Sequence, residues 1–85
     1  MKTFSYVIQD EMGIHARPAG MMVKEAKKYQ SLAKIKKGDK EAGLTQLMML
    51  MGLGIKQGDE VLVTIEGTDE EEASKAFEAF FRENL

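Results

Sequence analysis

The sequence predicts an α+β fold, an open-faced β-sandwich in which three helices cover one face of a four-stranded antiparallel sheet, in the order βαββαβα. Three observations lead to this prediction. Two segments alternate apolar residues with the period of a half-buried strand, and two others repeat them with the period of a helix. The chain has 85 residues, which is room for one hydrophobic core only. Residues 1–85 are therefore expected to form a single domain.

The first elements are a strand and a helix. Phe4, Tyr6 and Ile8 alternate with residues that would face away from the core, which is typical of a strand with one buried face. A helical pattern follows from Ala19, and Pro18 would lie in the first turn, where the N–H that proline lacks costs least. The apolar stripe of this helix comprises Ala19, Met22, Val23, Ala26 and Tyr29.

The middle of the chain predicts a hairpin, a short helix and a further strand. Residues 32–37 and 40–43 form the two strands of the hairpin, joined by a turn at 38–39. Residues 46–53 are rich in Leu and Met and end in glycines, which favours one or two helical turns. The alternation of β-branched residues over 60–66 predicts the last strand. The residues expected to face inward on these strands are Ala33, Ile35, Val61, Val63 and Ile65.

A final helix is expected to begin after Asp69. The spacing of Asp69 and Glu72 matches a capping box, in which each of the two side chains binds the backbone N–H of the other residue. The three glutamates at 70–72 suit the positive end of the helix, and we expect no metal site there. The core stripe of this helix would be Ala73, Ala76, Phe77 and Phe80.

Composition excludes several classes of protein. Cysteine is absent, so disulfides and thiolate nucleophiles are excluded, and a reducing, cytoplasmic setting is expected. A net charge of -2 does not give the broad positive field that nucleic-acid binding needs. No segment approaches the ~18 apolar residues of a membrane span, and the first residues alternate instead of forming a signal peptide. We expect a cytoplasmic protein with no membrane insertion and no nucleic-acid partner.

His15 is the single histidine, and it lies just before the first predicted helix. The backbone N–H groups of Ala16 and Arg17 would lack acceptors there. An imidazole is a nucleophile towards phosphorus, and a phosphoryl group on it would meet these N–H groups, the positive helix end and a guanidinium. One short segment thus combines a nucleophile with an anion cradle. The alternative is that His15 only caps the helix and that Arg17 is a solvated charge.

A second candidate surface is apolar. Residues 47–51 are Leu, Met, Met, Leu and Met, and a helix of one or two turns cannot bury all five. Exposed methionines are flexible and suit a surface that docks against several partners. Met21 would extend this surface towards His15. The alternative is that these side chains fill the core or form a dimer contact.

The heptad Gly-Ile-His-Ala-Arg-Pro-Ala at 13–19 resembles the active-site signature of the histidine-containing phosphocarrier (HPr) family, part of the bacterial phosphoenolpyruvate-dependent sugar phosphotransferase system. The resemblance extends to residues 6–8, 44–55 and 67–70, and so covers nearly the whole chain. It also implies the open-faced sandwich described above. A signature of this length in the expected place identifies the chain as similar to that family.

The resemblance implies a role for each site residue. His15 would receive a phosphoryl group on its ring Nδ1 from phosphorylated enzyme I and pass it to the IIA domains of sugar permeases. Arg17 would hold the phosphoryl oxygens, beside the N–H of Ala16. The protein would be a stoichiometric carrier with a phosphohistidine intermediate, without cofactor or metal and without turnover of its own. The implied docking surface comprises Ala16, Gly20, Leu47, Met48, Met49 and Met51.

Two residues depart from the family pattern. Many members carry a serine, phosphorylated by a regulatory kinase, where this chain has Gln46, so we expect no regulatory phosphorylation there. Thr45 is adjacent but lies off that position. Gly20 stands where small Ala or Thr residues are common, and a glycine inside a helix costs roughly 0.5–1 kcal/mol relative to alanine.

Two other functions compete with the carrier. The chain could be a regulatory paralogue whose His15 phosphorylation signals to partners outside transport, or an interaction module in which His15 is incidental. A freestanding enzyme is disfavoured, because no second catalytic group accompanies His15. A monomer is expected, since a shuttle must expose one surface to successive partners.

Overall fold

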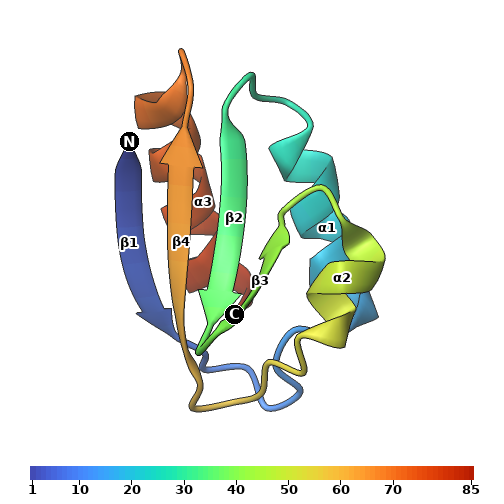
Figure 1. The fold of residues 1–85 in the computed structure, drawn as a ribbon. Helices are drawn as coiled ribbons and strands as arrows, with labels where there is room; N and C mark the ends of the chain where they lie inside the picture. The colour runs from blue at the N-terminus through green and yellow to red at the C-terminus, as the bar shows by residue number, and fades with distance from the viewer.

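The computed structural model describes residues 1–85 and has the predicted order of elements (Figure 1). The four strands form one sheet in the order β1-β4-β2-β3, and every neighbouring pair is antiparallel. The last strand in the sequence therefore lies in the middle of the sheet, between β1 and β2. The elements are β1 (Lys2–Val7), α1 (Ala16–Ala26), β2 (Leu32–Lys37), β3 (Lys40–Gly43), α2 (Leu47–Gly52), β4 (Glu60–Glu66) and α3 (Glu70–Asn84).

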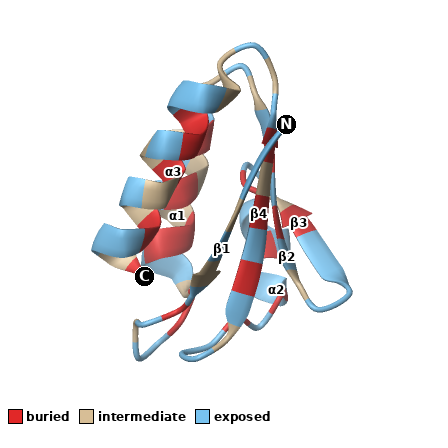
Figure 2. Cartoon of the chain, turned by 90° about the vertical axis from the view of Figure 1, so that its left-hand side faces the viewer, coloured by how far each residue is buried: buried red, intermediate tan, exposed pale blue.

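One face of the sheet is buried and the other is open, which confirms the open-faced sandwich. The register places Phe4 opposite Val63, and Val63 opposite Ile35, so that one inward-facing row crosses three strands. Figure 2 shows α1 and α3 on the buried face and no helix over the other. The short helix α2 packs beside α1 and β3, at the edge of the sheet that β3 forms. None of the three helices has both the length and the apolar character needed to cross a membrane.

The core stripe of α3 differs from the prediction at two positions. Ala76 is only half-buried, and Ser74 is buried instead. Phe77 is buried as predicted, but Phe80 is only half-buried, and Phe81 is buried completely. The ring of Phe81 meets those of Phe4 and Tyr6 edge-on, with centroid distances of 5.5 and 5.6 Å. Phe77 and Phe81 lie one helical turn apart, on the face that packs against β1.

The predicted capping box at the start of α3 is wrong. Asp69 is the N-cap residue, but its side chain caps nothing in the helix. Its carboxylate instead accepts hydrogen bonds from the backbone N–H groups of Gln30 (2.8 Å) and Ser31 (2.9 Å) and from the Ser31 hydroxyl. The loop between α1 and β2 passes the start of α3, and its three donors compete successfully with the helix. The Ser31 hydroxyl and the Gln30 N–H lower the pKa of Asp69 from its ordinary value.

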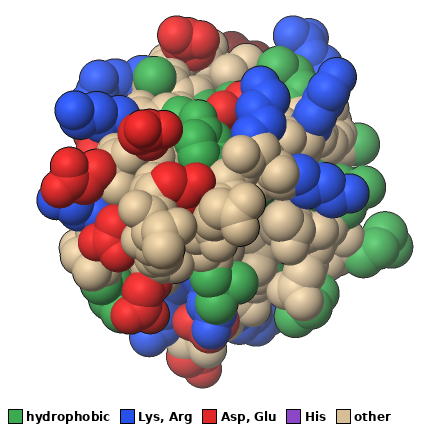
Figure 3. Space-filling view, turned by 90° about the horizontal axis from the view of Figure 1, so that it is seen from above, with side chains coloured by type: hydrophobic (Ala, Val, Ile, Leu, Met, Phe, Trp, Pro, Cys, Tyr) green, Lys and Arg blue, Asp and Glu red, His purple; other side chains and the backbone are tan.

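The two ends of the sandwich differ in character. The end viewed in Figure 3 carries both acidic and basic side chains, with most of the acidic ones gathered on one side, and no histidine is visible on it. The acidic first turn of α3 lies at this end. The segment from β1 to α1, which contains His15, lies at the opposite end of the molecule.

Candidate functional site

His15 occupies the N-cap position of α1. Its backbone is extended, with φ -105° and ψ -173°, and its carbonyl accepts the first helical hydrogen bond from the Ala19 N–H at 3.0 Å. His15 therefore does cap the helix, through its backbone, while its side chain makes no capping hydrogen bond. The residue is half-buried and is held through its backbone, and its ring nitrogens make no hydrogen bond within the protein.

A close contact with a neighbouring loop fixes the turn before His15. Gly13 has φ +66°, and a Cβ built on it would lie 2.2 Å from the carbonyl oxygen of Ile55. The next residue, Ile14, is buried and donates its N–H to the same oxygen at 3.2 Å. On the other side of the turn, Asp10 accepts from the Gly13 N–H through its carbonyl and from the Met12 N–H through its carboxylate. Only glycine fits at position 13 without displacing this arrangement.

The loop that carries Ile55 is itself held by Asp59. The Asp59 carboxylate forms an ion pair with Lys37 at 2.9 Å and accepts the Lys56 N–H at 2.8 Å. The Lys37 ammonium also donates to the carbonyl of Gly54 at 3.0 Å. The hydrogen bonds from Lys37 and Lys56 lower the pKa of Asp59 from its ordinary value. The sheet thus supports, through this loop, the position of the histidine.

Free donors surround the start of α1, as the sequence predicted. The N–H groups of Ala16 and Arg17 open the helix and donate to no other group of the protein. Pro18, the third helical residue, has no N–H to leave unpaired. The guanidinium of Arg17 is exposed and belongs to none of the ion pairs. Two free backbone donors therefore follow His15 directly in the chain, and a free cation lines the same pocket, an arrangement suited to an anion.

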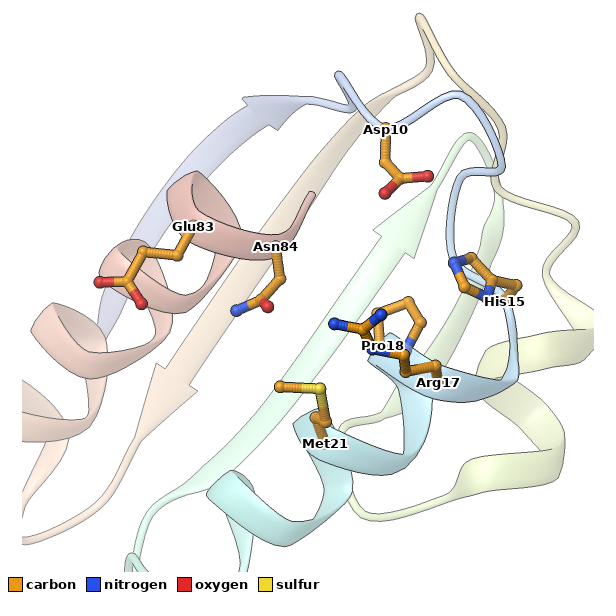
Figure 4. Close-up of a pocket in the computed structure, with 7 residues that line it drawn as sticks. All are labelled: Asp10, His15, Arg17, Pro18, Met21, Glu83 and Asn84. Carbon is orange, nitrogen blue, oxygen red and sulfur yellow. The ribbon is translucent and has the colours of Figure 1, made fainter.

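His15 and Arg17 line a common pocket of about 190 Å³ (Figure 4). That is several times the roughly 30 Å³ that a water molecule takes up in the liquid. Its walls come from the turn before α1, from α1 itself and from the end of α3. No three His, Asp or Glu side chains in the structure are placed to share a metal ion. The lining residues are Asp10, His15, Arg17, Pro18, Met21, Glu83 and Asn84.

The sequence placed His15 and Arg17 in one segment and Met21 near His15, and all three line the pocket. That Met21 extends the methionine surface stays a prediction, and part of the pocket was missed. Glu83 and Asn84 are separated from His15 by nearly the whole chain, and nothing in their local pattern marks them. The backbone supplies the link: the carbonyl of Leu85 accepts the N–H groups of Gln9 and Asp10, which ties the end of α3 to the turn.

The structure divides the predicted methionine surface. Leu50 is fully buried, so that one side chain fills the core, as the alternative reading of this segment had it. The other four members of the run are exposed: Met48 by 79%, Met49 by 52%, Met51 by 42% and Leu47 by 39%. We call these four the α2 patch. It lies on the helix that packs beside α1.

Two further positions from the sequence analysis lie on α1 and just before α2. Gly20 is half-buried on α1, and a Cβ there would meet nothing within 4 Å. Gln46 precedes α2, and its side-chain oxygen accepts the Gly43 N–H at 2.8 Å, which closes the turn between β3 and α2. The neighbouring Thr45 is exposed.

Fold and site together define a class of protein: a small open-faced sandwich that presents its single histidine beside free backbone donors at the start of its first helix. Residues 2–83 match the family described as "PTS HPr component phosphorylation site". The chain therefore belongs to the HPr family of phosphocarrier proteins of the phosphotransferase system.

Individual relatives agree with this assignment. Phosphocarrier protein HPr of Mycoplasma pneumoniae is 44% identical over 80 residues, which are 93% of this chain and 91% of that protein. A solved histidine-containing phosphocarrier protein of Mycoplasma is similar with a TM-score of 0.90 and 35% identity, over 93% of this chain and 90% of that one. The crystal structure of an HPr dimer from Thermoanaerobacter tengcongensis is similar with a TM-score of 0.77 and 37% identity, over 98% and 95%. The prediction of a phosphocarrier instead of an enzyme is confirmed.

Proposed function

We propose that this chain accepts a phosphoryl group on His15 from phosphorylated enzyme I and donates it to the IIA domains of sugar permeases. The observation that carries this proposal is the position of the only histidine, at the N-cap of α1, with unpaired N–H groups beside it and Arg17 in the same pocket. Family membership supports the same role.

The proposed transfer needs only one reacting side chain. The lone pair of His15 Nδ1 attacks the phosphorus, an N–P bond forms, and the electron pair of the broken bond returns to the donor protein. The incoming oxygens then accept hydrogen bonds from the N–H groups of Ala16 and Arg17 and from the Arg17 guanidinium. In the second transfer the same steps run towards the acceptor, so the chain ends each cycle unchanged.

The proposed docking surface joins the site to the α2 patch. The α2 patch, Ala16 and Gly20 lie on two helices that pack side by side, and a partner seated across them would face His15. The missing Cβ of Gly20 leaves space for close approach. We propose that the chain works in the cytoplasm as a monomer, because a carrier must expose this surface to each partner in turn.

Intact-mass measurement tests this function. Incubation with phosphoenolpyruvate, magnesium and purified enzyme I should add one phosphoryl group, which acid removes and a purified IIA domain takes over. The control His15→Ala should stay unlabelled, and its circular dichroism spectrum should match that of the unsubstituted chain. No added mass with enzyme I from the same organism would overturn the proposal. Labelling without transfer to any IIA domain would favour the regulatory paralogue.

A further inference from the structure

The pocket around His15 carries a fixed negative charge that the proposed transfer does not use. Asp10 is half-buried in the wall of this pocket. In Figure 4 its carboxylate points into the space between His15, Arg17 and Asn84, whereas the carboxylate of Glu83 points away from that space. Asp10 is therefore the acidic group that faces the place where a phosphoryl group would lie.

The backbone leaves this carboxylate little freedom to turn away. Its Oδ1 accepts the N–H of Met12 at 2.8 Å, and the Asp10 N–H itself donates to the carbonyl of Leu85 at 2.8 Å. Asp10 also forms no ion pair, so Arg17 does not neutralise it. The carboxylate is thereby held in the wall of the pocket that His15 and Arg17 line.

A like charge at this position has an energetic consequence. A phosphoryl group brings negative oxygens into a pocket where one wall attracts them, through Arg17 and the free N–H groups, and the opposite wall repels them. Repulsion acts on the phosphorylated state and is absent from the free state. The phosphoryl bond to His15 is then less stable than the attractive wall alone would make it.

We propose that Asp10 raises the transfer potential of phosphorylated His15, so that the group is held loosely enough to be passed on. This inference rests on the proposed function. Asp10 does not attack or protonate anything in this account; it acts through its charge on the phosphoryl oxygens. The oxygen that binds the Met12 N–H would be kept in Asp10→Asn, which makes that variant a nearly pure charge change.

A competition experiment measures this effect directly. Nitrogen-15-labelled unsubstituted chain and unlabelled Asp10→Asn are mixed with limiting phosphoenolpyruvate and a catalytic amount of enzyme I, which passes the group between them in both directions. Mass spectrometry then gives the phosphorylated fraction of each protein. We expect Asp10→Asn to hold a share about two- to tenfold larger at low salt, with the ratio falling towards one at about 1 M salt.

Two control variants separate charge from structure. Asp10→Glu keeps the charge and should restore a ratio near one. Glu11→Gln removes an exposed neighbouring charge that does not line the pocket, and should also give a ratio near one. Should Asp10→Asn fail to fold, Asp10→Ser provides a second neutral side chain that can accept the Met12 N–H.

The outcomes are distinguishable. Equal sharing of the phosphoryl group between the two proteins, or a ratio that does not respond to salt, overturns the role of Asp10 and leaves the carrier function intact. If neither protein becomes phosphorylated, the carrier function is overturned and this inference with it. A larger share for Glu11→Gln equal to that of Asp10→Asn would show a general effect of net charge, and would also overturn the inference.

Discussion

The turn before His15 is built around a contact between Gly13 and Ile55: the Ile55 carbonyl oxygen occupies the place where a side chain on Gly13 would begin. The same oxygen accepts the N–H of Ile14, so the backbone at positions 13 and 14 lies against this carbonyl and leaves no room for a side chain at position 13. The position of the histidine thus depends on a loop some forty residues further along the chain.

Gly13→Ala should destabilise the fold strongly for two reasons. The added methyl group clashes with the Ile55 carbonyl oxygen, and alanine is strained at the positive φ of this position. We expect the free energy of unfolding to fall by roughly 2–5 kcal/mol. Urea denaturation measures it. The matched control is Gly38→Ala, at φ +60° with nothing within 4 Å of the added carbon, where the loss should be about 1 kcal/mol. Equal losses at both positions would contradict the role of the Ile55 contact.

Asp69 should make the stability depend on pH. Its pKa is lower in the fold than the roughly 3.9 of an unfolded chain, because Ser31 and Gln30 donate to its carboxylate. The stabilisation is therefore present above about pH 4 and is lost as the pH falls through the folded value. Asp69→Asn should be less stable than the unsubstituted chain at pH 7, and the gap should close on acidification.

Denaturation at a series of pH values tests this expectation. Asp39→Asn, an exposed residue in the β2–β3 turn, is the control and should leave the pH profile unchanged. A gap between Asp69→Asn and the unsubstituted chain that stays constant from neutral to acidic pH would exclude the proposed origin of the stabilisation.

Phe81 should contribute more to stability than its neighbour Phe80. Its buried ring contacts Phe4 and Tyr6, and truncation to leucine leaves a gap against β1. We expect Phe81→Leu to cost roughly 1–3 kcal/mol and Phe80→Leu less than about 1 kcal/mol, measured by urea denaturation. The reverse order would show that α3 packs on its other side.

Met48→Ser should weaken binding without weakening the fold. Met48 is the most exposed member of the α2 patch, and a central apolar side chain of an interface is typically worth about 1–2 kcal/mol, or roughly five- to thirtyfold in Kd. Calorimetric titration with purified enzyme I measures the affinity. Leu32→Ser is the control, because Leu32 is 62% exposed on β2, outside the patch. A Kd that changes equally in both variants would argue against the patch.

The sequence predicts the elements well because each one carries a local pattern. The alternation at Val61, Val63 and Ile65 and the helical spacing from Ala19 are set by burial on one face, and the structure has both. The histidine, the free N–H groups and Arg17 were found for the same reason, since they share one short segment. The apolar run at 47–51 predicted a docking surface from the residues alone, and the exposure of the α2 patch supports it. Family resemblance added Ala16 and Gly20 to that surface.

Failures of the sequence analysis arose where distant segments compete. The carboxylate of Asp69 has the spacing of a capping box, but Ser31 and Gln30, from another loop, offer it three donors. Phe80 and Phe81 both fit a helical stripe, and contacts with Phe4 and Tyr6 of β1, far away in the sequence, accompany the burial of Phe81. Asp10 enters the pocket through a turn whose shape depends on Ile55, so no local pattern could place it there.

The most direct test of the account is a proton–nitrogen correlation spectrum recorded before and after phosphorylation by enzyme I. We expect phosphorus coupling at the Nδ1 of His15 and large downfield shifts of the amide protons of Ala16 and Arg17, because their free N–H groups become donors to phosphoryl oxygens. The amide of Leu62, whose side chain is exposed on the open face of the sheet, should not move. Phosphorus coupled to another side chain, or unshifted amides at Ala16 and Arg17, would contradict the site described above.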